Sequence, residues 1–134
     1  MDAGFQLEKH VQVYEKVLRL AAFNLYSHNR DDHSKNFSFL MNSALKWKFA
    51  PAYDLTFSSS SRDWHSTSFA GEYQNPTQAH LLELAATFGI KKPMEIINEV
   101  RTAVANWKQY AKNSNVSSCT NTTIERRIQG LLIV

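Results

Sequence analysis

The chain has 134 residues, of which 43% are hydrophobic, and this length and composition are typical of one folded domain that buries a real core. Its net charge of +3 is too small to indicate direct nucleic-acid binding. The single cysteine, Cys119, excludes an internal disulfide and favours a reducing compartment such as the cytoplasm. We expect no membrane contact, because no apolar run reaches a membrane-spanning length and the first residues lack the pattern of a signal peptide.

Residues 5–27 are predicted to form one helix. Apolar side chains recur there at steps of three and four residues, which gives a single apolar face: Leu7, Val11, Tyr14, Leu18, Ala21 and Leu25. The simplest interpretation of this face is packing against a core. The helix runs directly into residues 28–36, H-N-R-D-D-H-S-K-N, which we call the polar loop.

The polar loop combines residue types that suit phosphoryl transfer. Asp31 and Asn36 lie five residues apart, and Arg30 precedes Asp31, which is the R-D-x-x-x-x-N spacing of a protein-kinase catalytic loop. A carboxylate at Asp31 could orient an acceptor hydroxyl and take its proton. The amide oxygen of Asn36 could bind Mg²⁺, which prefers oxygen ligands. A solvated turn with side-chain-to-backbone bonds is the plainer alternative, and the complete pattern favours a functional site over it.

A β-hairpin is predicted directly after the polar loop. Residues 37–41 and 45–49 are rich in aromatic and apolar side chains, and a short polar turn separates them. An antiparallel pair would bring Asp54 back toward Asn36, so that both could bind one metal ion. We therefore expect Asp31, Asn36 and Asp54 to converge around one cleft.

The remainder of the chain is predicted to be mainly helical. Residues 57–63 should form a mobile polar loop with Trp64 anchoring it on the core, and residues 65–71 a short strand that ends at Gly71. Helices are expected at 78–88, between a Thr77 cap and Gly89, from Pro93 to about 112, and at 123–132, with a polar connector at 113–122. The predicted fold class is α+β, mostly α-helical, with one small hairpin.

Two segments carry a family resemblance. F-N-L-Y-S-H-N-R-D-D-H-S-K-N-F-S-F-L and F-A-P-A-Y-D-L-T closely resemble the C-terminal domain of the HipA-like serine/threonine kinases, toxins of bacterial toxin–antitoxin pairs. H-S-T-S-F-A-G and L-L-E-L-A-A-T-F-G-I also look like that family, so the resemblance runs from about residue 15 to the end of the chain. It implies a kinase-like C-terminal lobe occupying residues 1–134 as a single domain.

The resemblance also implies roles for individual residues. Asp31 would be the catalytic base, and Asn36 and Asp54 the Mg²⁺ ligands. His33 and Lys35 match motif positions as well and are the candidates for cofactor binding. Lys35 could meet a phosphate of ATP or pair with Asp31 or Asp54, and His33 could instead bond the loop backbone. Asp32 would act as a cap or in a salt bridge.

The nucleotide clamp of a kinase has no counterpart in this sequence. The glycines, at positions 4, 71, 89 and 130, do not form a glycine-rich loop. The resemblance implies that an N-terminal lobe supplies the clamp, so the chain is a fragment, a truncated product or one half of a split kinase. Its expected partners are ATP, Mg²⁺, that lobe, a DNA-binding antitoxin, and a protein substrate of the class of aminoacyl-tRNA synthetases, all in the cytoplasm.

Two other functions stay open at this point. The chain could be a non-catalytic remnant of the kinase fold that binds partners. It could also be a metal-dependent phosphohydrolase built on His28, Asp31, Asp32 and His33, which requires at least three of these side chains to converge on a metal such as Zn²⁺ or Mn²⁺.

Overall fold

The computed structural model describes residues 2–8 and 10–133 and has the predicted class, mostly helical with one small antiparallel sheet. Its elements, in chain order, are α1 (Asp2–Glu8), α2 (Gln12–Tyr26), the 3₁₀ turn η1 (Ser34–Asn36), β1 (Phe39–Met41), β2 (Trp47–Phe49), α3 (Gln78–Thr87), α4 (Pro93–Ala105), α5 (Trp107–Asn113) and α6 (Ser118–Leu131). Among the described residues, no helix has both the length and the apolar character to cross a membrane.

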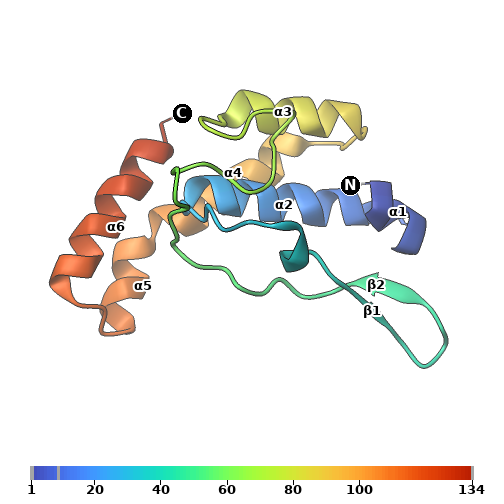
Figure 1. The fold of residues 1–134 in the computed structure, drawn as a ribbon, viewed down its shortest axis with the longest axis horizontal. Coiled ribbons are helices and arrows are strands. Elements are labelled where there is room, and N and C mark those ends of the chain that lie inside the picture. Colours follow the sequence, from blue (N-terminus) through green and yellow to red (C-terminus); the bar gives the residue numbers. More distant parts are fainter. Residues whose placement is uncertain (1, 9, 134) are drawn as a thin grey trace.

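Helix α2 is the centre of the molecule. It runs across the middle of the fold and packs most extensively against α4, while α3 and α6 also contact it (Figure 1). Its buried side chains include Leu18, Ala22, Leu25 and Tyr26. The core that they form is completed by Phe69, which lies outside the helices, and by buried side chains of α3, α4 and α6: Leu81, Ala85, Ile96, Ile97, Val100, Val104, Ile124 and Ile128.

The predicted hairpin is confirmed. Phe39 pairs with Phe49 and Met41 with Trp47 in antiparallel register, and the two phenylalanine rings meet edge to face at 5.3 Å between centroids. The hairpin projects away from the helices (Figure 1). Its base is held by α1, because the backbone N–H of Phe49 donates to Glu8 Oε2 at 2.9 Å.

The N-terminal segment is two helices, so the prediction of one helix over residues 5–27 is wrong. A turn separates α1 from α2, in which the Val13 N–H donates to the carbonyl of His10 at 3.1 Å. The Gln12 N–H also donates to Nδ1 of His10, at 3.2 Å, which satisfies a free amide at the start of α2. The turn leaves Val11 exposed, so the expected apolar face is interrupted there; Tyr14 is half-buried against Phe88, and burial of this face in the core begins at Leu18.

The helix predicted after Thr77 is confirmed. The Thr77 backbone N–H donates to His80 Nδ1 at 3.1 Å at the start of α3, and Gly89 follows the helix with φ +61°. A left-handed residue at this place is a common helix stop, and glycine takes it at no steric cost. Pro93 likewise opens α4 as predicted.

The end of the chain differs from the prediction at two points. Asn106 interrupts the helix expected from Pro93 to about 112, since its side-chain amide donates to the Thr102 carbonyl at 2.9 Å and its own carbonyl accepts from Gln109 N–H at 3.0 Å. The connector expected at 113–122 is partly helical, because α6 begins with Ser117 as its cap. Burial of Ile124 and Ile128 stabilises α6 despite its polar first turns.

Residues 64–72 also depart from the prediction. They form no strand; a bridge between Phe69 and Glu72 closes a tight turn in which Ala70 and Gly71 have φ +50° and +92°. Positive φ at both central positions is typical of two-residue hairpin turns. Trp64 is exposed and lies under the guanidinium of Arg62, so it does not anchor the loop on the core.

The packing of α2 can be tested with two leucine truncations. Leu18 is fully buried in the core, whereas Leu45 in the hairpin turn is 75% exposed. We expect Leu18→Ala to lower the free energy of unfolding by about 3 kcal/mol, because it leaves a cavity, and Leu45→Ala to change it by less than about 0.5 kcal/mol. Urea unfolding followed by circular dichroism measures both, and equal losses would contradict the assigned core.

Candidate functional site

The polar loop is held against residues 57–60 by backbone hydrogen bonds. The Arg30 N–H donates to the Ser58 carbonyl at 3.0 Å, and the Ser58 N–H donates to the His28 carbonyl at 3.1 Å. These bonds form an isolated parallel bridge between Asn29 and Ser58. The polar loop is therefore fixed by a segment that lies some thirty positions later in the chain.

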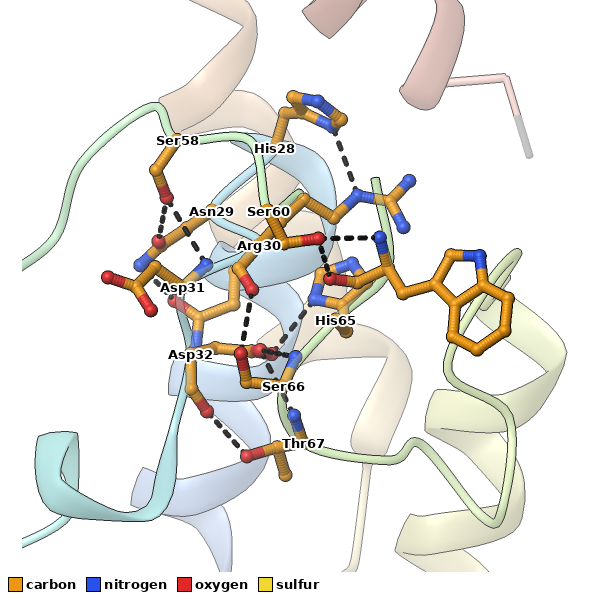
Figure 2. A network of polar contacts seen from close by, with 12 residues as sticks. His28, Asn29, Arg30, Asp31, Asp32, Ser58, Ser60, His65, Ser66 and Thr67 are labelled. Atoms are coloured by element: carbon orange, nitrogen blue, oxygen red, sulfur yellow. Dashed lines mark hydrogen bonds and ion pairs between the residues drawn. The ribbon is translucent and has the colours of Figure 1, made fainter. Parts of the chain in front are cut away.

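A buried carboxylate, Asp32, fixes the other side of the polar loop. Its side chain is 1% exposed, and Oδ2 lies 2.8 Å from Nδ1 of His65, which is fully buried. Oδ1 accepts the backbone N–H groups of Ser66 and Thr67 at 2.7 and 3.1 Å, and the Thr67 hydroxyl donates to the Asp32 carbonyl. Figure 2 shows these bonds joining the polar loop to residues 65–67.

The sequence did not predict this role for His65. The sequence analysis expected Asp32 to act as a cap or in a salt bridge; its carboxylate contacts the His65 ring and two backbone N–H groups, all from the segment that was predicted as a strand. The signal was present in the H-S-T-S-F-A-G motif, residues 65–71, where His65, Ser66 and Thr67 supply the groups that Asp32 binds.

Asn29 ties three segments together at the centre of the network. Its side-chain N–H₂ donates to Asn24 Oδ1 in α2 at 3.1 Å and to the Asp54 carbonyl at 3.3 Å, while its oxygen accepts from the Ser58 hydroxyl at 2.7 Å. Asn29 is buried, so these bonds satisfy an amide that could not otherwise be buried without cost.

Asp31 and Asn36 are brought together by the loop. The Asn36 side-chain N–H₂ donates to the Asp31 carbonyl at 3.0 Å, which leaves the Asn36 amide oxygen without a hydrogen bond from the described residues. The Asp31 carboxylate is 60% exposed and points away from the network (Figure 2). Asn36 itself is buried, so the loop pairs a fixed amide with a solvent-facing carboxylate.

The segment around Asp54 is attached to the polar loop at two points. The Asp54 carbonyl accepts from Asn29, and the Tyr53 hydroxyl donates to the carbonyl of Lys35, the residue before Asn36. Asp54 is exposed and has φ +55°, a conformation that is uncommon for residues with a Cβ. Such backbone outliers cluster at functional sites, where surrounding contacts maintain them.

The remaining candidates, His33 and Lys35, lie at the edge of the site. His33 Nε2 is 3.9 Å from Asp31 Oδ1, and its Nδ1 is buried without a hydrogen-bond partner among the described residues. Lys35 is exposed and makes no ion pair with Asp31 or Asp54 in the described part of the chain. Whether either residue binds a nucleotide stays a prediction.

His28, the first residue of the polar loop, is fully buried in a charged cluster. The Arg30 Nε–H donates to Nδ1 of His28 at 3.2 Å, and Asp63 Oδ1 lies 3.1 Å from Nε2, with Ser59 Oγ at 3.5 Å from the same nitrogen. Because Nδ1 accepts from Arg30, the proton of the neutral ring is on Nε2. The approach of Nε2 to Asp63 is an ion-pair distance without a hydrogen bond, since Asp63 Oδ1 has no hydrogen-bond partner among the described residues. Burial, together with Arg127 and Arg30, lowers the pKa of His28 from 6.5 to about 4, against the opposing effect of Asp63.

This geometry does not support the phosphohydrolase alternative, and it does not form a serine–histidine–acid triad either. A serine–histidine–acid triad needs the acid at one ring nitrogen and the serine at the other, whereas Asp63 and Ser59 share Nε2 of His28. Across residues 2–8 and 10–133, no group of three or more His, Cys, Asp or Glu side chains is placed to hold a metal ion. The convergence that a phosphohydrolase site on His28, Asp31, Asp32 and His33 requires is therefore not observed.

Together, these observations define a mostly helical α+β domain in which a buried polar network presents an aspartate loop to solvent. A family model described as the HipA-like C-terminal domain matches residues 3–107. The chain belongs to this family. No curated protein matches the chain. The family match starts earlier than the resemblance in the sequence suggested and leaves residues 108–134, with most of α5 and all of α6, outside it.

The two adjacent aspartates give a direct test of the network. We expect Asp32→Ala to lower the free energy of unfolding by about 3 kcal/mol, because it leaves His65 and two backbone amides buried without their acceptor. Asp31→Ala should change it by less than about 0.5 kcal/mol, since that carboxylate is exposed. Chemical denaturation of both variants is the measurement, and a larger loss for Asp31→Ala would contradict the assignment.

The lowered pKa of His28 predicts that the stability of the protein depends on pH. Between pH 6.5 and about 4 the unfolded chain protonates His28 and the folded chain does not, so the free energy of unfolding falls as the pH is lowered through this window. The shift corresponds to a loss of roughly 2 kcal/mol from pH 7 to pH 5. Urea unfolding at these two pH values should show this loss in the wild type and not in His28→Gln. An equal loss of unfolding free energy in both proteins would contradict the role of His28.

Proposed function

We propose that this chain is the part of an ATP- and Mg²⁺-dependent serine/threonine protein kinase of the HipA-like toxin type that carries the catalytic base and the metal ligands. The supporting observation is the double attachment of the Asp54 segment to the polar loop, through Asn29 and through the carbonyl of Lys35. It keeps Asp54 beside the loop that contains Asp31 and Asn36. Membership of the HipA-like C-terminal domain family supports the same role.

The donor atoms fit a magnesium ion. The Asn36 amide oxygen and the Asp54 carboxylate are both oxygen ligands, which Mg²⁺ prefers, and two protein ligands suffice where phosphate oxygens and water supply the others. When bound, Mg²⁺ would neutralise charge on the transferring phosphate. The buried Asn36 N–H₂, held by the Asp31 carbonyl, orients its amide oxygen for this purpose.

Asp31 would act on the acceptor substrate. Its carboxylate is exposed, so it can accept a hydrogen bond from a serine or threonine hydroxyl and take the proton as the hydroxyl attacks. Lys35 is exposed and without an ion pair among the described residues, so it could meet a phosphate oxygen. His33 lies beside Asp31 and would complete the cofactor contacts.

The proposed kinase is completed by an N-terminal lobe that clamps the nucleotide. Apolar side chains of the hairpin and the segment after it are exposed, among them Leu40, Met41, Trp47 and Leu55. Leu55 also lines a groove of about 540 Å³ between α2, α4 and residues 49–55, whose walls are mainly apolar side chains. A surface of this kind suits a protein partner better than water. We propose the missing lobe as that partner.

The other partners follow from the family. A protein substrate of the aminoacyl-tRNA synthetase class, a DNA-binding antitoxin and a cytoplasmic location belong to the proposal, as they do for HipA-like toxins. The second candidate function is a non-catalytic remnant that binds partners through the same exposed apolar surface. Retention of Asp31, Asn36 and Asp54 favours the kinase.

The kinase proposal predicts that the 134-residue chain alone transfers almost no phosphate. Losing one donor that stabilises the transition state costs on the order of 100-fold in rate, and an absent lobe removes several. Adding an N-terminal lobe of a HipA-like kinase, fused or as a separate chain, should restore transfer from labelled Mg-ATP to protein. Asp31→Ala in the reconstituted protein should abolish it.

Exposed Glu15 on α2 offers a matched control, since Glu15→Ala also removes a surface carboxylate and should leave transfer unchanged. Strong transfer by the chain alone would contradict the incomplete-kinase proposal. Folded, reconstituted protein that transfers no phosphate, with all three site residues intact, would favour the non-catalytic remnant.

A further inference from the structure

Helix α6 is joined to the polar loop through one side chain, Asp63. Arg127 of α6 lies 2.8 Å from Asp63 Oδ2, and Nε2 of His28 lies 3.1 Å from Oδ1 of the same carboxylate. Arg30 is 4.0 Å from that oxygen. The carboxylate of Asp63 thus bridges a residue of the C-terminal helix and the first residue of the polar loop.

Asp63 lies between two anchored ends of its segment, in the part that has few hydrogen bonds to the rest of the fold. Ser58 is bonded to the polar loop by its backbone and hydroxyl, and His65 is bonded to Asp32. Between them, Ser59 Oγ makes a long contact of 3.5 Å with Nε2 of His28, and among the described residues Ser60 bonds only Trp64 and Asp63 of the same segment. Residues 59–64 therefore have fixed ends and depend on Asp63 for their main side-chain contact with the rest of the fold.

The two partners of Asp63 are themselves firmly placed. Ile124 and Ile128 are buried in the core on either side of Arg127 in the sequence, so the packing of α6 sets where the guanidinium lies. His28 is fully buried, accepts from Arg30 and packs against the Phe57 ring at 5.1 Å between centroids. Asp63 has φ +55°, a conformation that the surrounding contacts must maintain.

We propose that α6 acts as a latch on residues 59–64: the Arg127–Asp63 ion pair holds this segment closed over His28, and its loss opens the segment while the polar loop stays in place. Asp32 and Asn29 anchor the polar loop independently of Asp63. The region beyond the family match would in this way control access to one side of the site. The proposal concerns the order of the segment and does not depend on the proposed kinase activity.

Hydrogen exchange followed by mass spectrometry on the 134-residue chain tests the latch. We expect Arg127→Ala and Asp63→Asn each to speed exchange of the amides of residues 59–64 by about three- to five-fold, the range of a partly exposed ion pair. Exchange in residues 29–36 and in α6 should stay as in the wild type. Arg126→Ala is the matched control, because Arg126 is the neighbouring exposed arginine and should cause no change.

Salt and the double variant complete the test. In 1 M NaCl the amide exchange rate of residues 59–64 in the wild type should approach that of the variants, because the Arg127–Asp63 pair is partly exposed and salt screens it. Arg127→Ala combined with Asp63→Asn should add little to either change alone, since both remove one interaction. Unchanged exchange in both single variants, an equal effect of Arg126→Ala, or an increase spread equally over α6 would each overturn the proposal.

Discussion

The burial of one carboxylate, Asp32, is the constraint on which the site depends. A carboxylate removed from water costs several kcal/mol unless hydrogen bonds compensate for the lost hydration. Asp32 obtains them from His65 and from the backbone N–H groups of Ser66 and Thr67, and these partners can meet it only if residues 65–67 fold back onto the polar loop. Its neighbour Asp31 is then left exposed at a fixed position. Of the two adjacent aspartates, Asp32 therefore holds the structure, and Asp31 is accessible for the proposed chemistry.

A second buried group, Asn29, fixes the other half of the site. We call the hydrogen bonds of Asp32 and Asn29 together the buried frame. It joins α2, through Asn24, to Ser58 and to the carbonyl of Asp54. Helix α2 is fixed by the helical core, and Asn29 bonds the segment after the hairpin to it, so this segment is held in place by the core. The buried frame therefore supports the proposed metal ligands without using either of their ligating oxygens, and it leaves the hairpin projecting away from the helices (Figure 1).

The sequence predicted the elements that have strong local signals. The hairpin, the Thr77 start and Gly89 stop of α3, and Pro93 at the start of α4 are all confirmed. The breaks at residues 10–11 and at Asn106 were missed because helical periodicity continues across them, whereas hydrogen bonds to His10 and Thr102 decide the outcome. The network was missed for a related reason. Asp32 and His65 are thirty-three residues apart, and no local pattern pairs them.

The separation between the Asn36 amide oxygen and the Asp54 carboxylate tests the central claim most directly. A crystal structure of the chain with Mg²⁺ would measure it. If the buried frame holds both residues at one site, the two groups should lie about 3–6 Å apart, since Mg²⁺–oxygen distances are about 2 Å. A structure in which the Asp54 carboxylate lies on the opposite face of the domain from Asn36 would contradict the shared magnesium site and the function built on it.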